Sequence, residues 1–146
     1  MNEIVLFLEA ERIRVERLYS KSKHAVGFNN KQGLANWYTA QLGEQNYCCK
    51  YCETSIFTIQ ALIKAGLLKT RKVRGEGVRG PVLEIDKVRN EDGYYPQNCV
   101  LACYYCNNDK SYTVDGEAYK TYFGNARKKF FEYLSTLLPS SKSKVD

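Results

Sequence analysis

The sequence predicts an α+β domain in which a small pair of strands, held by a structural zinc ion, is surrounded by several helices. Three observations support this prediction. Two Cys-x-x-Cys pairs, Cys49–Cys52 and Cys103–Cys106, have the spacing of zinc knuckles. Two short apolar runs, "PVLEIDKV" and "CVLAC", are separated by a turn that contains Asp-Gly and Pro. Helical patterns precede and follow this region.

The N-terminal part is predicted to be helical. Residues 3–20 form a pattern that becomes amphipathic towards its end. "SKSKHAVGFNN", residues 20–30, interrupts the pattern and predicts a basic loop. A second helix is expected from Lys31 to about Gln45, because apolar side chains recur on one face. These side chains are Leu34, Trp37, Tyr38 and Leu42.

A third helix is expected directly after the tight knuckle "CCKYC". Thr54 or Ser55 can cap its N-terminus, and Gly66 lies near its end. Beyond the second knuckle the helical pattern resumes in two pieces around Gly124. Its expected core residues are Phe130, Phe131, Leu134 and Leu137.

The chain of 146 residues suits one compact domain rather than two. We divide it into a helical part (1–45), a zinc-bound core (46–112), C-terminal helices (113–138) and a frayed tail (139–146).

Charge and hydropathy bear on partners and location. The formal net charge of +6 favours an acidic partner such as nucleic acid. The N-terminal apolar run, Ile4 to Leu8, is too short for a signal peptide or a membrane span. We therefore expect a cytoplasmic protein with no membrane partner. Thiols stay reduced there, so paired cysteines more often bind metal than form disulfides.

Four thiolates in two knuckles can complete a tetrahedron around one zinc ion. The alternative is a redox dithiol, which needs only one such pair, usually in a thioredoxin-like context. Two cysteines are left over, Cys48 and Cys99, and are interpreted as small buried side chains. A register in which Cys48 replaces Cys49 stays open.

The segment from Lys69 to Gly80 is rich in glycine and strongly basic, and it predicts a mobile loop. A solvated linker is the simpler interpretation of such a charge run. Because the run leads directly into the first strand, we favour a phosphate-contacting loop. The candidate nucleic-acid-binding residues in it are Arg71, Lys72, Arg74 and Arg79.

The stretch "LEIDKVRNEDGYYPQNCVLACYYCNNDK" resembles the HNH endonucleases, also called ββα-metal or His-Me finger nucleases. The resemblance covers about residues 49–112 and is most specific from Glu84 to Lys110. It implies a small ββα-metal core. It also implies that Asp86 and Asn107 ligate a divalent cation, that Asn98 braces the loop between the strands, and that Lys110 faces a phosphate.

These residue types suit the implied chemistry. Mg²⁺ or Mn²⁺ prefers oxygen ligands and keeps waters that a phosphate can displace. The chain departs from the family at Lys87, which stands where the general-base histidine is expected. An unperturbed lysine is protonated at neutral pH and takes no proton from water. We therefore expect Lys87 to act electrostatically on the phosphate, and the identity of the base stays open.

Other candidates are weaker. His24 is the single histidine and lies in the predicted basic loop, so we interpret it as exposed, with a catalytic role as the less favoured alternative. Packing is the simplest role for the nearby tyrosines, although one of them could stack on a base or position a water. These are Tyr94, Tyr95, Tyr104 and Tyr105. Glu84 is a second-rank candidate ligand.

The favoured hypothesis is a metal-dependent HNH-type endonuclease that cuts or nicks DNA and leaves a 5′ phosphate. The alternative is an inactive, HNH-derived zinc module that binds nucleic acid or a protein partner. A thiol redox protein is a third interpretation. A small chain that recognises a duplex often acts as a homodimer, which we hold as a further hypothesis.

Overall fold

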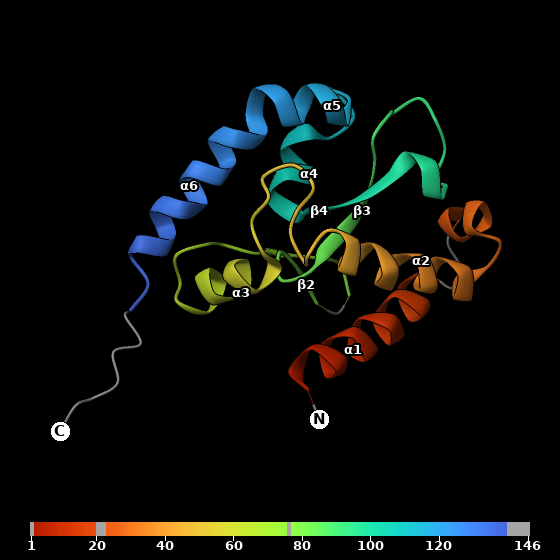
Figure 1. Ribbon diagram of the computed structural model, residues 1–146, viewed down its shortest axis with the longest axis horizontal. Coiled ribbons are helices and arrows are strands. Elements are labelled where there is room, and N and C mark those ends of the chain that lie inside the picture. The colour runs from red at the N-terminus through yellow and green to blue at the C-terminus, as the bar shows by residue number, and fades with distance from the viewer. Residues whose placement is uncertain (1, 20–22, 76, 140–146) are drawn as a thin grey trace.

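The computed structural model describes residues 2–19, 23–75 and 77–139, and it combines helices with two separate two-stranded sheets (Figure 1). The α-helices are α1 (Glu3–Leu18), α2 (Lys31–Glu44), α3 (Ile56–Lys64), α4 (Tyr104–Lys110), α5 (Gly116–Tyr119) and α6 (Asn125–Thr136). The strands are β1 (Arg71–Lys72), β2 (Val78–Arg79), β3 (Leu83–Lys87) and β4 (Cys99–Cys103). The 3₁₀ helices are η1 (Lys23–Phe28) and η2 (Pro96–Asn98), and η3 (Lys120–Gly124) is a π-helical turn. Within the described residues, no helix has both the length and the apolar character needed to cross a membrane.

The first two helices pack against each other and support the central sheet. Asn30 caps α2 by accepting a hydrogen bond of 2.8 Å from the backbone N–H of Gly33. The expected apolar face of α2 is confirmed, with Leu34, Tyr38 and Leu42 buried. The Tyr38 hydroxyl donates a hydrogen bond of 2.6 Å to the carbonyl of Leu83, which joins α2 to β3. The predicted basic loop differs, because residues 23–28 form a turn of 3₁₀ helix.

The two expected strands form the antiparallel pair β3–β4, with Leu83 opposite Cys103 and Lys87 opposite Cys99. All of β4 is buried. Because side chains alternate along a strand, Glu84 and Asp86 lie on the same face of β3, where they contact Asn107 and Lys110 of α4. In the described residues β3 pairs with β4 alone, so its other edge carries no strand.

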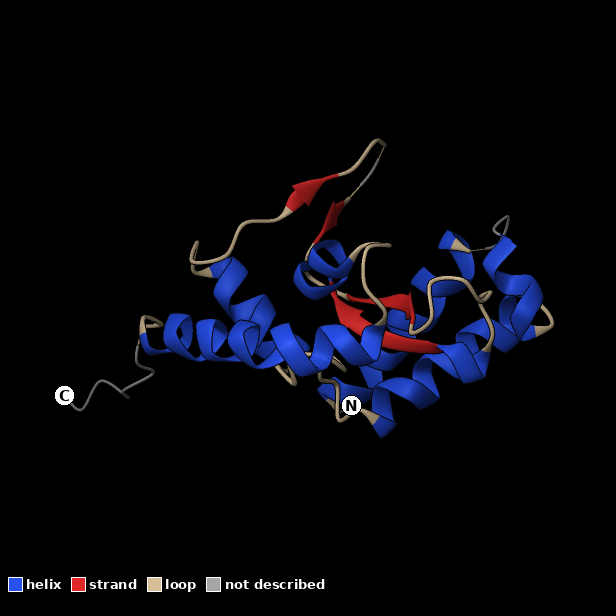
Figure 2. Cartoon of the chain, turned by 90° about the horizontal axis from the view of Figure 1, so that it is seen from above, coloured by secondary structure: helices blue, strands red, loops and turns tan. Residues whose placement is uncertain are grey.

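The predicted mobile loop is partly ordered as a short hairpin. Arg71 pairs with Arg79 and Lys72 with Val78. Gly75 and Gly77 lie at φ of 94° and 97°, the left-handed conformations that turn the chain between β1 and β2. Figure 2 shows that this pair of strands stands apart from the β3–β4 pair, which helices surround.

The C-terminal helices correct two expectations. The helical path does not break around Gly124 but runs from α5 through the π-helical turn η3 into α6. A Cβ on Gly124 would lie 2.3 Å from the Tyr51 carbonyl oxygen, so glycine here permits close packing on the first knuckle. Of the expected core residues, Phe131 and Leu134 are buried, whereas Phe130 and Leu137 are 45% and 49% exposed. Residues 140–146 of the predicted tail lie outside the described residues.

Candidate metal centre and adjoining cleft

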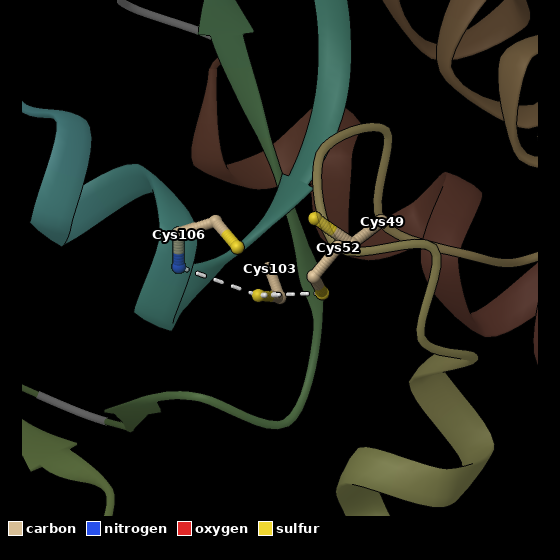
Figure 3. A group of neighbouring side chains, drawn as sticks. All are labelled: Cys49, Cys52, Cys103 and Cys106. Carbon is tan, nitrogen blue, oxygen red and sulfur yellow. Dashed lines mark hydrogen bonds between the residues drawn. The ribbon is translucent and has the colours of Figure 1, made fainter. Parts of the chain in front are cut away.

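The four knuckle cysteines come together in one buried cluster (Figure 3). Their sulfur atoms all lie within 4.8 Å of one another, and those of Cys52 and Cys103 are 3.9 Å apart. A tetrahedral zinc ion with Zn–S bonds of about 2.3 Å places its sulfur ligands about 3.8 Å apart. The cluster can therefore hold a metal ion such as zinc.

The first knuckle is fastened to β4 by Gln45. Its side chain donates a hydrogen bond of 2.9 Å to the carbonyl of Leu101 and accepts one of 3.0 Å from the N–H of the same residue. The backbone N–H of Lys50 also donates to the Leu101 carbonyl, at 2.9 Å. The open edge of β4 is thus covered, and the two knuckles are brought together. Sequence reasoning did not single out Gln45, because a glutamine at a helix end carries no local signal.

The two remaining cysteines stay outside the cluster. The Cys48 thiol lies 3.3 Å from the carbonyl oxygen of Asn46. The sulfur that joins the cluster belongs to Cys49, so Cys49 and not Cys48 is the knuckle residue. Cys48 was expected to be buried, but its side chain is only half-buried. Cys99 is buried as expected, and burial raises its pKa to about 11. A thiol with such a pKa stays protonated and unreactive at neutral pH.

Asp86 and Lys110 form a buried ion pair. The Lys110 ammonium is 3.2 Å from one Asp86 oxygen, and its side chain has no exposed surface. It also donates to the Asn90 side chain at 3.0 Å. The Tyr51 hydroxyl donates to Asp86 at 2.6 Å. Burial raises the pKa of Asp86, while Tyr51 and Lys110 oppose that shift. Lys110, expected to face a phosphate, is instead enclosed against Asp86.

Asn107 lies beside Glu84 rather than beside Asp86. Its amide nitrogen donates a hydrogen bond of 2.9 Å to one Glu84 oxygen. The Arg79 guanidinium bonds both oxygens of the same carboxylate, at 2.6 and 2.9 Å. The carboxylate next to Asn107 is therefore that of Glu84, the second-rank candidate ligand. This follows from the way α4 lies beside β3, which pairs Asn107 with Glu84 and Lys110 with Asp86.

Asn98 is buried and holds the loop that joins the strands. Its amide donates to the carbonyls of Arg89 and Gly93 at 3.1 and 3.0 Å, and its oxygen accepts from the Arg89 N–H at 3.0 Å. These three bonds satisfy backbone groups of the turn between the strands, which lie outside the β3–β4 pairing. The contacts match the bracing position that the family resemblance implies.

Lys87 faces away from the Glu84–Asn107 pair. Its ammonium donates a hydrogen bond of 3.0 Å to the carbonyl of Asn90 and lies 5.1 Å from the centre of the Tyr94 ring. A carbonyl oxygen and an aromatic face thus both contact the Lys87 ammonium.

A cleft of about 920 Å³ runs along the unpaired edge of β3. Its polar and aromatic lining comes from α1 and its C-cap, η1, the β1–β2 hairpin, β3, the loop after β3 and α4. These residues are Arg14, Arg17, Tyr19, His24, Arg74, Arg79, Glu84, Tyr94 and Asn107. Arg74 and Arg79 were expected from the basic loop, whereas Arg71 and Lys72 are exposed outside the cleft. The arginines of α1 were not anticipated, because only the fold brings that helix here.

The other tyrosines near the motif pack or brace the chain. Tyr104 is buried beneath the Arg79 guanidinium, 4.6 Å from its ring centre. Tyr105 donates a hydrogen bond of 2.7 Å to the carbonyl of Lys69. Tyr95 lies 3.4 Å from an Arg89 nitrogen. Tyr94 alone of the four lines the cleft.

Comparisons with protein-family models, with curated proteins and with solved structures found no match for this chain. A function therefore has to be inferred from the motif residues and from the contacts described above.

Proposed function

We propose that this protein is a metal-dependent endonuclease of the HNH type that acts on DNA phosphodiester bonds. One observation carries the proposal. Glu84 and Asn107, a carboxylate and an amide, line a cleft that also contains Arg14, Arg17 and Arg74. The cysteine cluster joins β4 and α4 to the first knuckle, and β3, which carries Glu84, pairs with β4. Oxygen ligands for a hard cation thus stand beside cations suited to a polyphosphate backbone.

The two acids of β3 differ in how well they suit a catalytic cation. The Asp86 side chain is 9% exposed and already bears the Lys110 ammonium, so a second cation does not fit there in this arrangement. Glu84 and Asn107 face the cleft and offer the oxygen donors that Mg²⁺ or Mn²⁺ prefers. Glu84 and Asn107 would hold the cation in place of the Arg79 guanidinium that Glu84 binds in this structure. When bound, it supplies Lewis-acid stabilisation of the charge that develops on the phosphate.

The remaining polar groups of the cleft have roles that follow from their positions. Arg14 is held by the Glu11 carboxylate at 2.6 Å and by the Tyr38 hydroxyl at 3.1 Å, so its guanidinium is preorganised. Arg74 projects from the glycine-rich hairpin and can follow a bound strand. The Arg79 guanidinium, once released from Glu84, is placed to contact the phosphate under attack. Such fixed cations bind the backbone without reading its sequence.

Nicking of supercoiled plasmid DNA in the presence of Mg²⁺ or Mn²⁺ tests the proposal. The wild-type protein should convert the plasmid to open circles, and a chelator should stop the reaction. Glu84→Ala and Asn107→Ala should each lower the rate at least about 100-fold, as expected for a lost electrostatic contact to the transition state. Cys48→Ser changes a residue outside both sites and should leave the rate unchanged. Absence of nicking with every divalent cation tried would refute the proposal.

A specific observation favours the second candidate, a zinc module that binds nucleic acid without cutting it. Both acids of β3 are already neutralised by the chain's own cations, Asp86 by Lys110 and Glu84 by Arg79. Lys87 also stands in place of the family's base. This candidate predicts DNA retention that weakens steeply with salt, with no nicking at any cation concentration. Loss of Arg14 or Arg74 would then reduce the salt dependence by about one unit of log–log slope each.

A further inference from the structure

The proposed hydrolysis needs a proton acceptor that the motif itself does not contain. Water attacks a phosphodiester efficiently only when a neighbouring group takes its proton. Lys87 is bound through its ammonium and is unsuited to that task. The chain has a single histidine, His24, and its position therefore becomes decisive.

The fold brings His24 to the end of β3. The 3₁₀ helix η1 packs directly on the turn after that strand, since a Cβ on Gly27 would lie only 1.7 Å from the Tyr94 carbonyl oxygen. The His24 ring meets the Tyr94 ring edge to face, with their centroids 3.8 Å apart. The Lys87 ammonium lies 5.1 Å from the centre of the same ring. The His24 imidazole therefore lies against Tyr94 and close to the Lys87 side chain at the end of β3.

His24 also shares the cleft with the groups that would hold the reacting phosphate. Glu84, Asn107 and Arg79 line the same cavity of about 920 Å³. The ring of Tyr19, at the C-cap of α1, also meets the imidazole edge to face, with ring centroids 5.5 Å apart. Two aromatic neighbours hold the ring in place, so the imidazole has a defined position rather than that of an exposed loop side chain.

We propose that His24 is the general base of the nuclease reaction, a role supplied from the N-terminal helical part and resting on the proposed function. One imidazole nitrogen accepts a proton from the attacking water as its oxygen forms the new bond to phosphorus. The bond from phosphorus to the 3′ oxygen breaks, and that oxygen keeps the electron pair and takes a proton from solvent. The products are a 5′ phosphate and a 3′ hydroxyl, and the imidazolium returns its proton to water.

The surroundings of His24 favour the neutral imidazole that this role requires. Burial, followed by the positive charge of Lys87, lowers the pKa of His24 below its ordinary value. Among the described residues, the groups in contact with it or acting on its charge include Tyr19 at the C-cap of α1, Tyr94 from the turn and Lys87 from β3. The other charged groups of the cleft are Arg14, Arg17, Arg74, Arg79 and Glu84.

A pH–rate profile of plasmid nicking tests the assignment. His24→Gln should lower the rate at neutral pH by about 100-fold or more and should remove the acid limb of the profile, because glutamine takes no proton. Free imidazole added to this variant should restore part of the rate. DNA retention at fixed salt should stay within about twofold of wild type, which separates a lost base from a lost contact.

Val26→Ala is the matched control, since Val26 belongs to the same 3₁₀ helix, is 76% exposed and does not line the cleft. It should nick at the wild-type rate. If His24→Gln nicks at nearly the wild-type rate with an unchanged pH profile, His24 is not the base and the nuclease proposal stands. If the reduced rate is accompanied by neither imidazole rescue nor a change in the profile, the role of His24 is structural and the inference is wrong. A wild-type protein that never nicks overturns both proposals.

Discussion

Replacement of Lys110 by methionine should destabilise the protein strongly, although it keeps the length and apolar stem of the side chain. Lys110 is fully buried, and its ammonium contacts the Asp86 carboxylate, the Asn90 side chain and the Ser111 carbonyl. Without it, Asp86 keeps only the Tyr51 hydroxyl as a side-chain partner in a site where its carboxylate is 9% exposed. Breaking a buried pair in this way costs about 3–5 kcal/mol.

That cost is a large share of the roughly 5–15 kcal/mol that stabilises an ordinary domain. It corresponds to a fall in melting temperature of roughly 6–20 °C for a chain of this size. Urea unfolding followed by circular dichroism measures the free energy, and an unchanged m-value shows that the unfolded state is unaltered.

A double-mutant cycle shows whether the loss comes from the pair. Lys110→Met combined with Asp86→Asn should cost clearly less than the sum of the two single changes, because no buried charge is left unpaired. Lys128→Met is the matched control, since Lys128 pairs with Glu53 at 3.7 Å with both side chains exposed, and it should stay within about 0.5 kcal/mol of wild type. A cost under about 1 kcal/mol for Lys110→Met, or strict additivity in the cycle, would refute the reasoning.

Three further predictions concern the metal centre, the packing of the knuckle and pH. Cys49→Ser should lower both the melting temperature and the zinc content measured by elemental analysis, whereas the adjacent Cys48→Ser should change neither. Equal effects of the two changes would show that Cys49 is not the ligand that distinguishes the pair. Gly124→Ala should destabilise by about 1–3 kcal/mol, because the added Cβ meets the Tyr51 carbonyl oxygen at 2.3 Å; a neutral result would show that α6 can shift. Because the pKa of His24 is lowered on folding, its contribution to stability is present above the unfolded value of about 6.5 and is lost as pH falls through the folded-state pKa. His24→Gln should therefore flatten the stability–pH curve in that window, and an unchanged curve would contradict the shift.

The local features of this protein could be predicted from its sequence because each depends on neighbours along the chain. The Cys-x-x-Cys spacing predicted which four cysteines gather in one cluster. The strands at residues 83–87 and 99–103 follow from apolar runs on either side of a turn. A cap at Thr54 or Ser55 was expected, and the structure uses Ser55; the buried face of α2 likewise follows from a short-range pattern. The choice between Cys48 and Cys49 as the metal ligand could not be predicted, since both share the same local context.

Tertiary structure alone decided which side chains share the site. Glu84 and Asp86 lie on the same face of β3, so the strand pattern does not distinguish them. Only the position of α4 places Asn107 beside Glu84 and Lys110 beside Asp86. His24 and the arginines of α1 lie about 60 or more residues from β3 in sequence, and no periodicity relates them to it. They meet in the cleft because α1 packs on α2, and α2 packs on β3. Contacts of this kind depend on buried faces closing around a common core, and a pattern read along one segment contains no information about the segment that covers it.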